Sequence, residues 1–410
     1  MTRFRSLKHR NFQLFIVGQL VSLIGTWMQT TAQLWLLYRL TGSAALLGVF
    51  GFANQIPMLL LASVGGFVGD RYSRQRGVIA TQTVSMLLAF LLAWLTISNR
   101  VQVWHLIAIT LLVGIVNAFD VPIRQAFFVE MVGKEDLPNA IALNSSIFNG
   151  ARVVGPAIAG FAIAWIHEGW CFFLNGVSFL AVILALLAMR IQNVERKPSN
   201  ESPWQSLLQG FRFAMKDRPI RSALLLLSTL SLLGLQYSSF MPVFAKDILH
   251  GDAQSLGLLM SAAGVGAVLG ALQFAARTSY KGLSKWIATM SLICSVGLIV
   301  FSRSHIFWLS TMVLFVVGFA ATSQMAATNT TVQNRVPDEL RGRVMAVYAT
   351  MFMGVQPIGA LLAAGLVKRW GAPETLTIFG SVCLLCSVAF AVWVLVRVRP
   401  GEKAAARAGI

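Results

Sequence analysis

Apolar residues recur along the whole chain in blocks of about twenty, and this repetition restricts the fold more than any other feature. A helix rises ~1.5 Å per residue, so each block is long enough to cross the ~30 Å hydrocarbon core of a bilayer. Stretches such as 106–116 and 296–301 do not alternate in polarity, which disfavours a transmembrane β-barrel. Only 12% of the residues are charged, against ~25% in an average soluble domain. The sequence therefore predicts an all-α polytopic membrane protein.

The blocks predict twelve transmembrane helices arranged as two six-helix bundles. We place the spans at 11–38, 44–68, 77–98, 103–131, 140–166, 170–190, 220–245, 255–276, 284–302, 306–333, 342–367 and 372–396. The longest polar stretch, 191–219, divides these spans six and six. We therefore expect an N-terminal bundle (1–190), a cytoplasmic linker (191–219), a C-terminal bundle (220–397) and a cytoplasmic tail (398–410).

The linker contains apolar residues at helical spacing. The positions i, i+3, i+4, i+7 and i+11 are occupied by Trp204, Leu207, Leu208, Phe211 and Met215. This stripe predicts an amphipathic helix that lies on the inner membrane surface or across the two halves. A helix that binds a partner is the alternative.

The chain has a formal net charge of +18, and the positions of the basic residues along the sequence indicate what this charge means. Most of its 33 Lys and Arg residues fall on one side of the predicted spans, as the positive-inside rule requires. The charge therefore indicates topology and attraction to anionic lipid, and it does not indicate binding to nucleic acid. We expect a monomeric multi-pass protein of the bacterial inner membrane, with both termini and the linker in the cytoplasm.

A weak internal repeat supports two parallel halves. Gly66, expected in the loop after the second helix, has an equivalent in Gly270 after the eighth, and the stretch 134–138 before the fifth helix resembles 337–341 before the eleventh. Two such halves are typical of transporters that rock around a central site.

The turn between the second and third helices carries the most specific motif. It reads Gly66-Phe-Val-Gly-Asp70-Arg71-Tyr-Ser73-Arg74-Gln-Arg76. This resembles the G-x3-D-R-x-G-R-R/K motif of the major facilitator superfamily (MFS), although Ser73 replaces a glycine and Arg76 comes one residue late. The resemblance implies the MFS fold and an inner gate in which Arg74 pairs with Glu130 and Asp70 faces the start of the eleventh helix. A solvated loop that follows only the positive-inside rule is the alternative.

Charged residues within the fourth and fifth helices mark a second candidate site. An ionised side chain inside a span costs ~2.5–3.5 kcal/mol on insertion scales, so such residues are functional candidates by default. Asp120 and Arg152 lie at similar depth, ~16 Å and ~18 Å from the inner ends of their helices, and Arg124 shares the helical face of Asp120. We expect Asp120 to carry protons and to pair with both arginines. An ion pair that only orients the two helices is the alternative.

Glycines and a proline in the fifth helix form a third element. Gly155, Pro156 and Gly160 resemble the G-P-x-x-G-G element of MFS antiporters, with Ala159 in place of a glycine. Small residues also allow close helix packing without any coupling role, which is the alternative. The resemblance implies proton-driven export. The chain most resembles the drug and siderophore exporter branch, which contains macrolide efflux proteins and the enterobactin exporter. Three features carry this resemblance: the stretch from Asp120 to Gln125, the amphipathic helix predicted in 191–219, and Arg341-Gly342-Arg343 after a proline.

Polar residues at other predicted spans are candidates to line a substrate cavity, and each is alternatively a partner in a helix-to-helix hydrogen bond. They are Gln29, Gln33, Asn149, Gln236, Tyr237, Gln324, Asn329 and Gln356.

The sequence as a whole predicts a secondary active transporter that exports a small amphipathic compound in exchange for protons. Uptake or lipid flipping on the same fold is the alternative. A membrane-embedded enzyme is disfavoured, because the sequence contains no HxxxD or HExxH pattern and no phosphate-binding glycine loop. We expect no metal and no cofactor.

The predicted topology can be tested by cysteine labelling. A cysteine introduced at Ser199, in a variant without the native cysteines, should resist an impermeant thiol reagent in intact cells and react after the cells are opened. Labelling from outside intact cells would show that the orientation is wrong.

Overall fold

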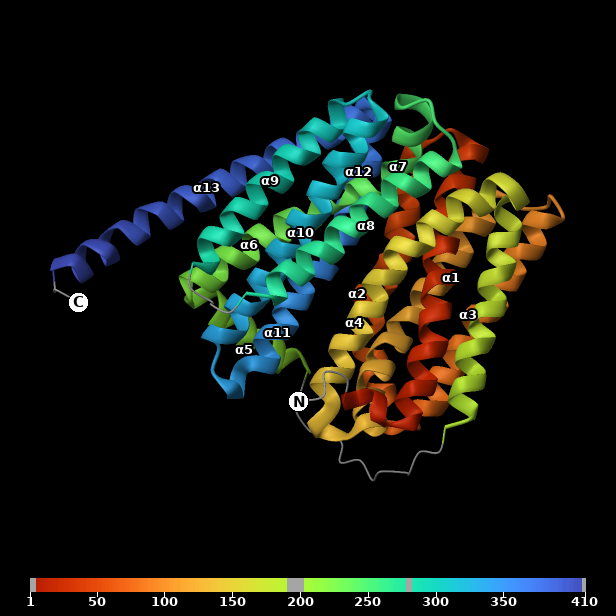
Figure 1. Cartoon of the computed structure of the whole chain (residues 1–410), viewed down its shortest axis with the longest axis horizontal. Coiled ribbons are helices and arrows are strands. Elements are labelled where there is room, and N and C mark those ends of the chain that lie inside the picture. The colour runs from red at the N-terminus through yellow and green to blue at the C-terminus, as the bar shows by residue number, and fades with distance from the viewer. Residues whose placement is uncertain (1–4, 190–202, 278–281, 408–410) are drawn as a thin grey trace. The chain divides into compact units, whose positions relative to one another are not determined.

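The computed structural model describes residues 5–189, 203–277 and 282–407, with the side chains of Asp70, 203–206 and 397–407 left out of the description. Within these ranges all regular structure is helical (Figure 1), which confirms the predicted all-α class. The N-terminal part of the chain forms η1 (Arg5–Lys8), α1 (Arg10–Thr41), α2 (Ala44–Arg71), α3 (Arg74–Ile97) and α4 (Val103–Leu187).

The rest of the chain also consists of helices, several of them interrupted by short 3-10 or π turns. They are α5 (Pro203–Lys216), α6 (Arg218–Leu232), η2 (Gly234–Phe240), α7 (Met241–Val243), η3 (Phe244–Ile248), α8 (Ala253–Ala275), α9 (Leu283–Arg303), α10 (Phe307–Arg335), α11 (Asp338–Ala349), η4 (Thr350–Gly354), α12 (Gln356–Trp370) and α13 (Ala372–Arg407). The helix α13 continues into the segment predicted as a tail.

Helix α4 is 85 residues long and breaks at two positions, Gly133 and His167. Gly133 has φ 73°, a value that glycine adopts easily because it has no Cβ. His167 has φ 64°, which is uncommon for a residue with a side chain. The two breaks divide α4 into three helical segments: residues 103–132, 134–166 and 168–187.

The helices have the length and surface of membrane spans. Ten stretches of the described residues are long and apolar enough to cross a bilayer, the whole of α4 counting as one of them. The predicted count of twelve stays a prediction. Large apolar side chains such as Leu60, Trp308 and Leu385 remain 64–73% exposed. Apolar exposure on this scale suits contact with lipid.

Contacts divide the chain into two compact units. The first comprises Met1–Asn200 and Ser239–Gly264, and the second comprises Glu201–Ser238 and Val265–Ile410. The sequence placed Ser239–Gly264 in the C-terminal bundle. By its contacts this segment belongs with the first unit, because Gly257 brings its backbone close to Pro156 of α4.

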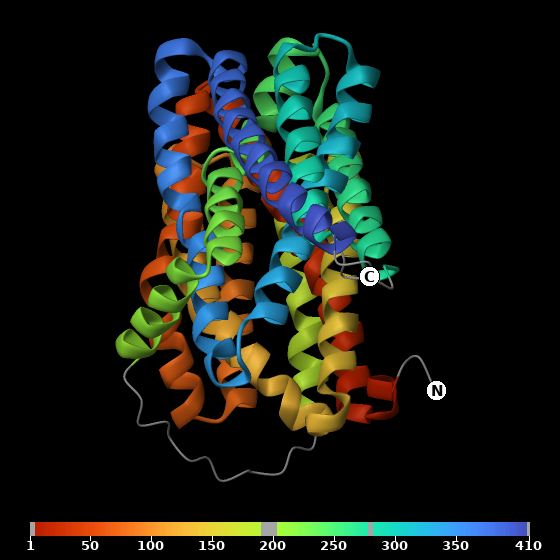
Figure 2. The same ribbon diagram turned by 90° about the vertical axis from the view of Figure 1, so that its left-hand side faces the viewer.

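Each unit has its own apolar core, and its helices run side by side (Figures 1 and 2). In the first unit, Phe12 and Phe15 of α1 contact Phe128 of α4 edge to face, with ring centroids 6.4 and 5.6 Å apart. In the second unit, a cluster around Leu224 and Val344 joins α6, α10 and α11 to the amphipathic helix α5. The helix predicted in the linker is thus present, and its buried Gly210 packs on the backbone of α11.

Candidate functional site

Asp120 lies buried at the contact of α3 with α4, with 2% of its surface exposed. Its Oδ2 is 3.2 Å from Nε of Arg124, one turn further along α4. Its Oδ1 accepts hydrogen bonds from Thr81 Oγ1 at 2.7 Å and from Gln82 Nε2 at 3.0 Å, both on α3. The carboxylate therefore has three donors from two helices, and the prediction that Arg124 pairs with it is confirmed.

The prediction that Arg152 pairs with Asp120 is wrong. Within the described residues no ion pair joins them, and the Arg152 guanidinium lies 5.8 Å from the ring centroid of Trp27 on α1. Similar depth does not specify how a helix is rotated, and Asp120 contacts Arg124 and the α3 side chains while Arg152 contacts Trp27. Trp27 also contacts Phe148 edge to face, so Arg152 belongs to a separate cationic and aromatic cluster.

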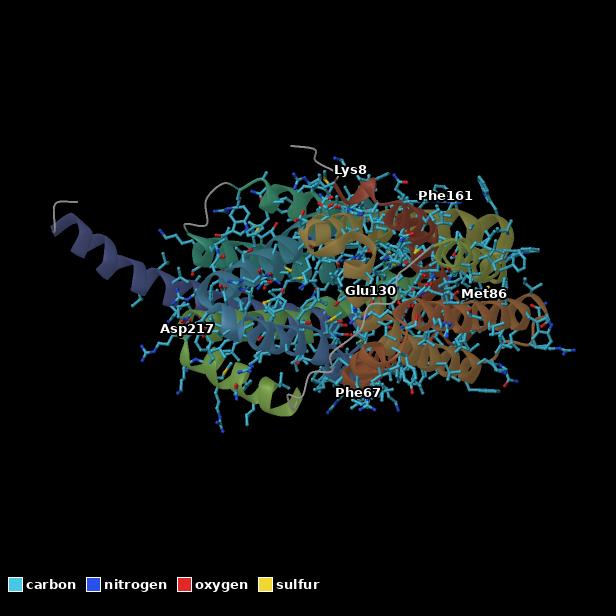
Figure 3. The ribbon with its side chains drawn as sticks, turned by 90° about the horizontal axis from the view of Figure 1, so that it is seen from below. Lys8, Phe67, Met86, Glu130, Phe161 and Asp217 are labelled. Carbon is cyan, nitrogen blue, oxygen red and sulfur yellow. The ribbon has the colours of Figure 1, made fainter. Side chains whose placement is uncertain are left out.

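The inner turn forms the contact expected of Arg74. Its Nη1 lies 3.2 Å from Oε1 of Glu130, labelled in Figure 3, and 2.9 Å from the carbonyl oxygen of Ala126. Its Nε donates to the carbonyl oxygen of Gly69 at 3.3 Å. Both charged side chains are largely buried, at 15% and 7% exposure. Arg74 therefore ties the end of α2 and the start of α3 to α4.

The remaining motif residues behave differently from Arg74. Arg71 is exposed, and its guanidinium lies 4.3 Å from the ring of Phe67 in its own helix. Ser73 accepts a hydrogen bond from the Arg76 backbone as the N-cap of α3, which gives a physical reason for a serine where the family has glycine. The side chain of Asp70 lies outside the described part of the structure, so its contact with the eleventh helix stays a prediction.

Gly66 does not lie in a loop as predicted, because α2 continues to Arg71. A Cβ at Gly66 would meet no atom within 4 Å. The neighbouring Gly65 makes the close contact instead, since a Cβ there would lie 2.3 Å from the carbonyl oxygen of Ala118 on α4. The motif match thus selected the glycine adjacent to the one that packing requires.

Gly155, Pro156 and Gly160 lie at two close helix contacts of the first unit. A Cβ at Gly155 would lie 2.5 Å from Trp27 Cβ on α1, and one at Gly160 would lie 2.8 Å from the carbonyl oxygen of Ala253 on α8. The packing role of this element is therefore visible in the structure, and the antiport role stays a prediction.

The cavity candidates of the first unit have mixed surroundings. Gln29 is buried and accepts a hydrogen bond from Asn175 at 2.8 Å, so it joins α1 to the last segment of α4. Asn149 donates to Ser145 in its own helix. Gln33 is buried, and its Nε2 has no partner among the described residues.

In the second unit the candidates fall into neighbouring groups. Gln236 donates to the carbonyl oxygen of Gln356 at 3.2 Å, which brings these two together, and Tyr237 is buried beside Gln236 in sequence. Gln324 donates to Thr328 and Asn329 accepts from Gln333, each pair lying within α10. The structure does not show these residues around one cavity.

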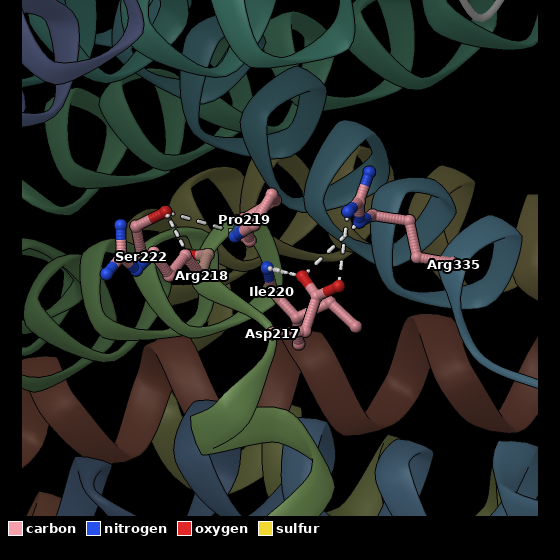
Figure 4. Close-up of polar contacts among 6 residues, drawn as sticks. All are labelled: Asp217, Arg218, Pro219, Ile220, Ser222 and Arg335. Atoms are coloured by element: carbon pink, nitrogen blue, oxygen red, sulfur yellow. Dashed lines mark hydrogen bonds and ion pairs between the residues drawn. The ribbon is translucent and has the colours of Figure 1, made fainter. Parts of the chain in front are cut away.

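Several contacting residues were missed by the sequence reasoning. In the second unit, Asp217 accepts from the Ile220 backbone as the N-cap of α6, and both carboxylate oxygens bind Arg335, with N–O distances of 3.1 and 3.3 Å (Figure 4). An aspartate followed within two residues by a proline is a typical N-terminus of a helix. Capping rules could therefore have identified Asp217 as the N-cap.

In the first unit, at the end opposite the Arg74–Glu130 contact, Glu168 is 2% exposed. It binds Arg39 through both carboxylate oxygens, at 2.9 and 3.1 Å. The hydroxyl of Tyr38 donates to Asp247. These residues stand at predicted helix ends, where a charge is ordinary, so no sequence feature indicated that they pair. Thr81 and Gln82 likewise lacked a signal, because uncharged polar residues occur in many spans.

Comparison with known proteins identifies the family. The family model described as transmembrane secretion effector, which belongs to the MFS, matches residues 1–409. The chain belongs to this family, and its relatives are transporters rather than enzymes.

Curated relatives cover nearly the whole chain. The staphyloferrin A transporter of Staphylococcus aureus is 27% identical over 90% of this chain and 93% of its own length. The multidrug efflux pump Tap of Mycolicibacterium fortuitum is 24% identical, with 92% and 93% covered. The enterobactin exporter EntS of Shigella boydii is 24% identical, with 87% and 85% covered. A mutant form of the nucleoside transporter NupG shares the fold, with a TM-score of 0.75 at 15% identity over 93% of this chain and 99% of that one.

The two motif arginines provide a matched pair for testing the inner contact. Arg74→Gln removes one partner of a largely buried ion pair and should destabilise the protein by about 3 kcal/mol. Arg71→Gln changes an exposed side chain and should alter stability by less than about 0.5 kcal/mol. Thermal unfolding in detergent measures both, and equal effects would contradict the assignment of the contact to Arg74.

The adjacent glycines provide a second pair. Gly65→Ala places a methyl group against the α4 backbone and should cost about 1–3 kcal/mol. Gly66→Ala meets open space in a helix and should leave stability unchanged or raise it by up to about 1 kcal/mol. The same unfolding assay compares them. The reverse order would show that the motif glycine, rather than its neighbour, makes the close contact.

Proposed function

We propose that this transporter exports a small amphipathic compound, a drug or a siderophore-like molecule, in exchange for protons and by alternating access. The observation that carries the proposal is the buried carboxylate of Asp120 at the contact of two helices. The relatives named multidrug efflux pump Tap and enterobactin exporter EntS support export, and these two together with the staphyloferrin A transporter support the substrate class.

Asp120 has the chemistry of a proton carrier. As a carboxylate it is stabilised by Arg124, Thr81 and Gln82, and these contacts offset the cost of a buried charge. Addition of a proton removes the attraction to Arg124 and the charged acceptor to which Gln82 of α3 donates. Protonation therefore changes how firmly α3 and α4 hold together, which is what coupling to a conformational change requires.

Contacts at both ends of the first unit supply parts that can separate during transport. Arg74 and Glu130 join helices at the end predicted to face the cytoplasm, and Tyr38 and Asp247 join α1 to η3 at the other. Charge-assisted contacts of this kind are discrete and can break as a unit. We place the protein in the bacterial inner membrane with both termini in the cytoplasm, as the distribution of basic residues indicates.

The cluster of Arg152, Trp27 and Phe148 suits a ligand that has an aromatic ring and negative charge. A guanidinium over an indole ring combines a cation with a flat apolar surface. Catecholate siderophores and many drugs have this combination, and the cluster supports that class without selecting one compound.

Asp120→Asn should abolish substrate-induced proton movement in proteoliposomes, down to the level of protein-free liposomes, while still permitting downhill exchange of substrate. The amide keeps the size of the side chain and cannot take up a proton. Glu374→Gln is the control, because Glu374 is about half exposed and pairs with Arg303 at 3.6 Å. Wild-type proton flux in Asp120→Asn would remove Asp120 as the carrier. Uptake by everted vesicles, compared with that by whole cells, tests the direction.

A further inference from the structure

The hydroxyl of Thr81 lies within hydrogen-bonding distance of two acceptors. Its Oγ1 is 2.7 Å from Asp120 Oδ1 and 2.9 Å from the carbonyl oxygen of Val78 in its own helix. A hydroxyl has one hydrogen to donate and two lone pairs that can accept. Thr81 therefore donates to one of these oxygens at a time, and its oxygen is free to accept when its hydrogen points to Val78.

Gln82 binds the same carboxylate oxygen in a different way. Its Nε2 donates to Asp120 Oδ1 at 3.0 Å, and an amide nitrogen cannot accept a hydrogen bond. Its Oε1 is buried and has no partner among the described residues. In the observed orientation Gln82 serves the ionised acid. It could accept from the protonated acid only after its amide group turned and placed Oε1 near Asp120. Gln82 Oε1 is therefore the acceptor that competes with Thr81 Oγ1 for the acid O–H.

The charges around Asp120 are few. Among the described residues, Arg124 on its own helix is the one charged side chain at ion-pair distance. Helix α3 contributes uncharged Thr81 and Gln82, and α2 approaches the same stretch of α4 through Gly65 and Gly69. The hydrogen bonds of α3 therefore adapt to the protonation of Asp120 without a second ion.

We propose that Thr81 is a positioning residue that holds Asp120 in both of its protonation states without a movement of the backbone. When Asp120 is ionised, the Thr81 hydroxyl donates to Oδ1. When a proton binds Oδ1, the acid O–H donates to Thr81 Oγ1, and Thr81 turns its own hydrogen to the carbonyl oxygen of Val78. The hydrogen of Thr81 then has an acceptor in each state, and the hydrogen of the protonated acid has Thr81 Oγ1 as its acceptor. The inference rests on the proposed function, since it assigns a role in the protonation of Asp120.

Infrared difference spectroscopy of the reconstituted full chain, between neutral and acid pH, tests this role. The carbonyl band of protonated Asp120 is identified by its loss in Asp120→Asn. In Thr81→Val the band should move to higher wavenumber, because the acid loses its acceptor. Thr81→Ser keeps the hydroxyl and should restore the wild-type position, which a purely structural role of the methyl group would not do.

The pH at which the band reaches half its amplitude provides the second measurement. Gln82→Met removes a donor that serves only the ionised acid, and proton affinity should rise roughly tenfold. Thr81→Val removes one hydrogen bond from each state, so its proton affinity should change much less.

The outcomes separate the two ideas. A band that Thr81→Val does not move, or a proton affinity that rises as far in Thr81→Val as in Gln82→Met, would overturn the role of Thr81 alone. The absence of any band that Asp120→Asn removes would overturn the proposed proton carrier as well.

Discussion

A polar group inside a bilayer has no water to bind, so each one depends on partners supplied by the protein. The backbone meets this requirement by forming helices along the apolar stretches of the described residues. Asp120 meets it with three donors, two from α3 and one from its own helix. These polar bonds between α3 and α4 thus depend on one carboxylate, and a change of its charge alters its bonds to both helices.

Glycines place the helices close enough for such contacts to form. Between helices in lipid the hydrophobic effect gives little attraction, so small residues that allow backbones to touch contribute much of the packing. Gly65 brings α2 onto α4, and Gly155 and Gly160 bring α4 onto α1 and α8. The element that resembles an antiporter motif is therefore also a set of helix contacts, and a proline within it removes one backbone hydrogen bond of α4.

Within the described part of the chain, charged pairs lie at or near the ends of helical segments, apart from Asp120 and Arg124. Arg74 with Glu130, Arg39 with Glu168, and Asp217 with Arg335 each stand at or next to the end of a helical segment. At such positions head groups and water reduce the cost of a charge. A pair at a helix end can thus form and break at lower cost than one at mid-depth, which suits parts that separate while the core of each unit stays packed.

The sequence by itself determined the fold class, the family resemblance and two charge pairs. Apolar blocks of span length leave the backbone no alternative to helices, and the spacing of Asp120 and Arg124 by one turn puts them on one helical face. The tertiary structure decided the partners contributed by other helices. Similar depth suggested Arg152 as a partner for Asp120, but depth does not specify how a helix is rotated, and Thr81 and Gln82 occupy that face instead. The choice of Gly65 over Gly66, and the contacts of Ser239–Gly264 with the first unit, depend in the same way on which backbones touch.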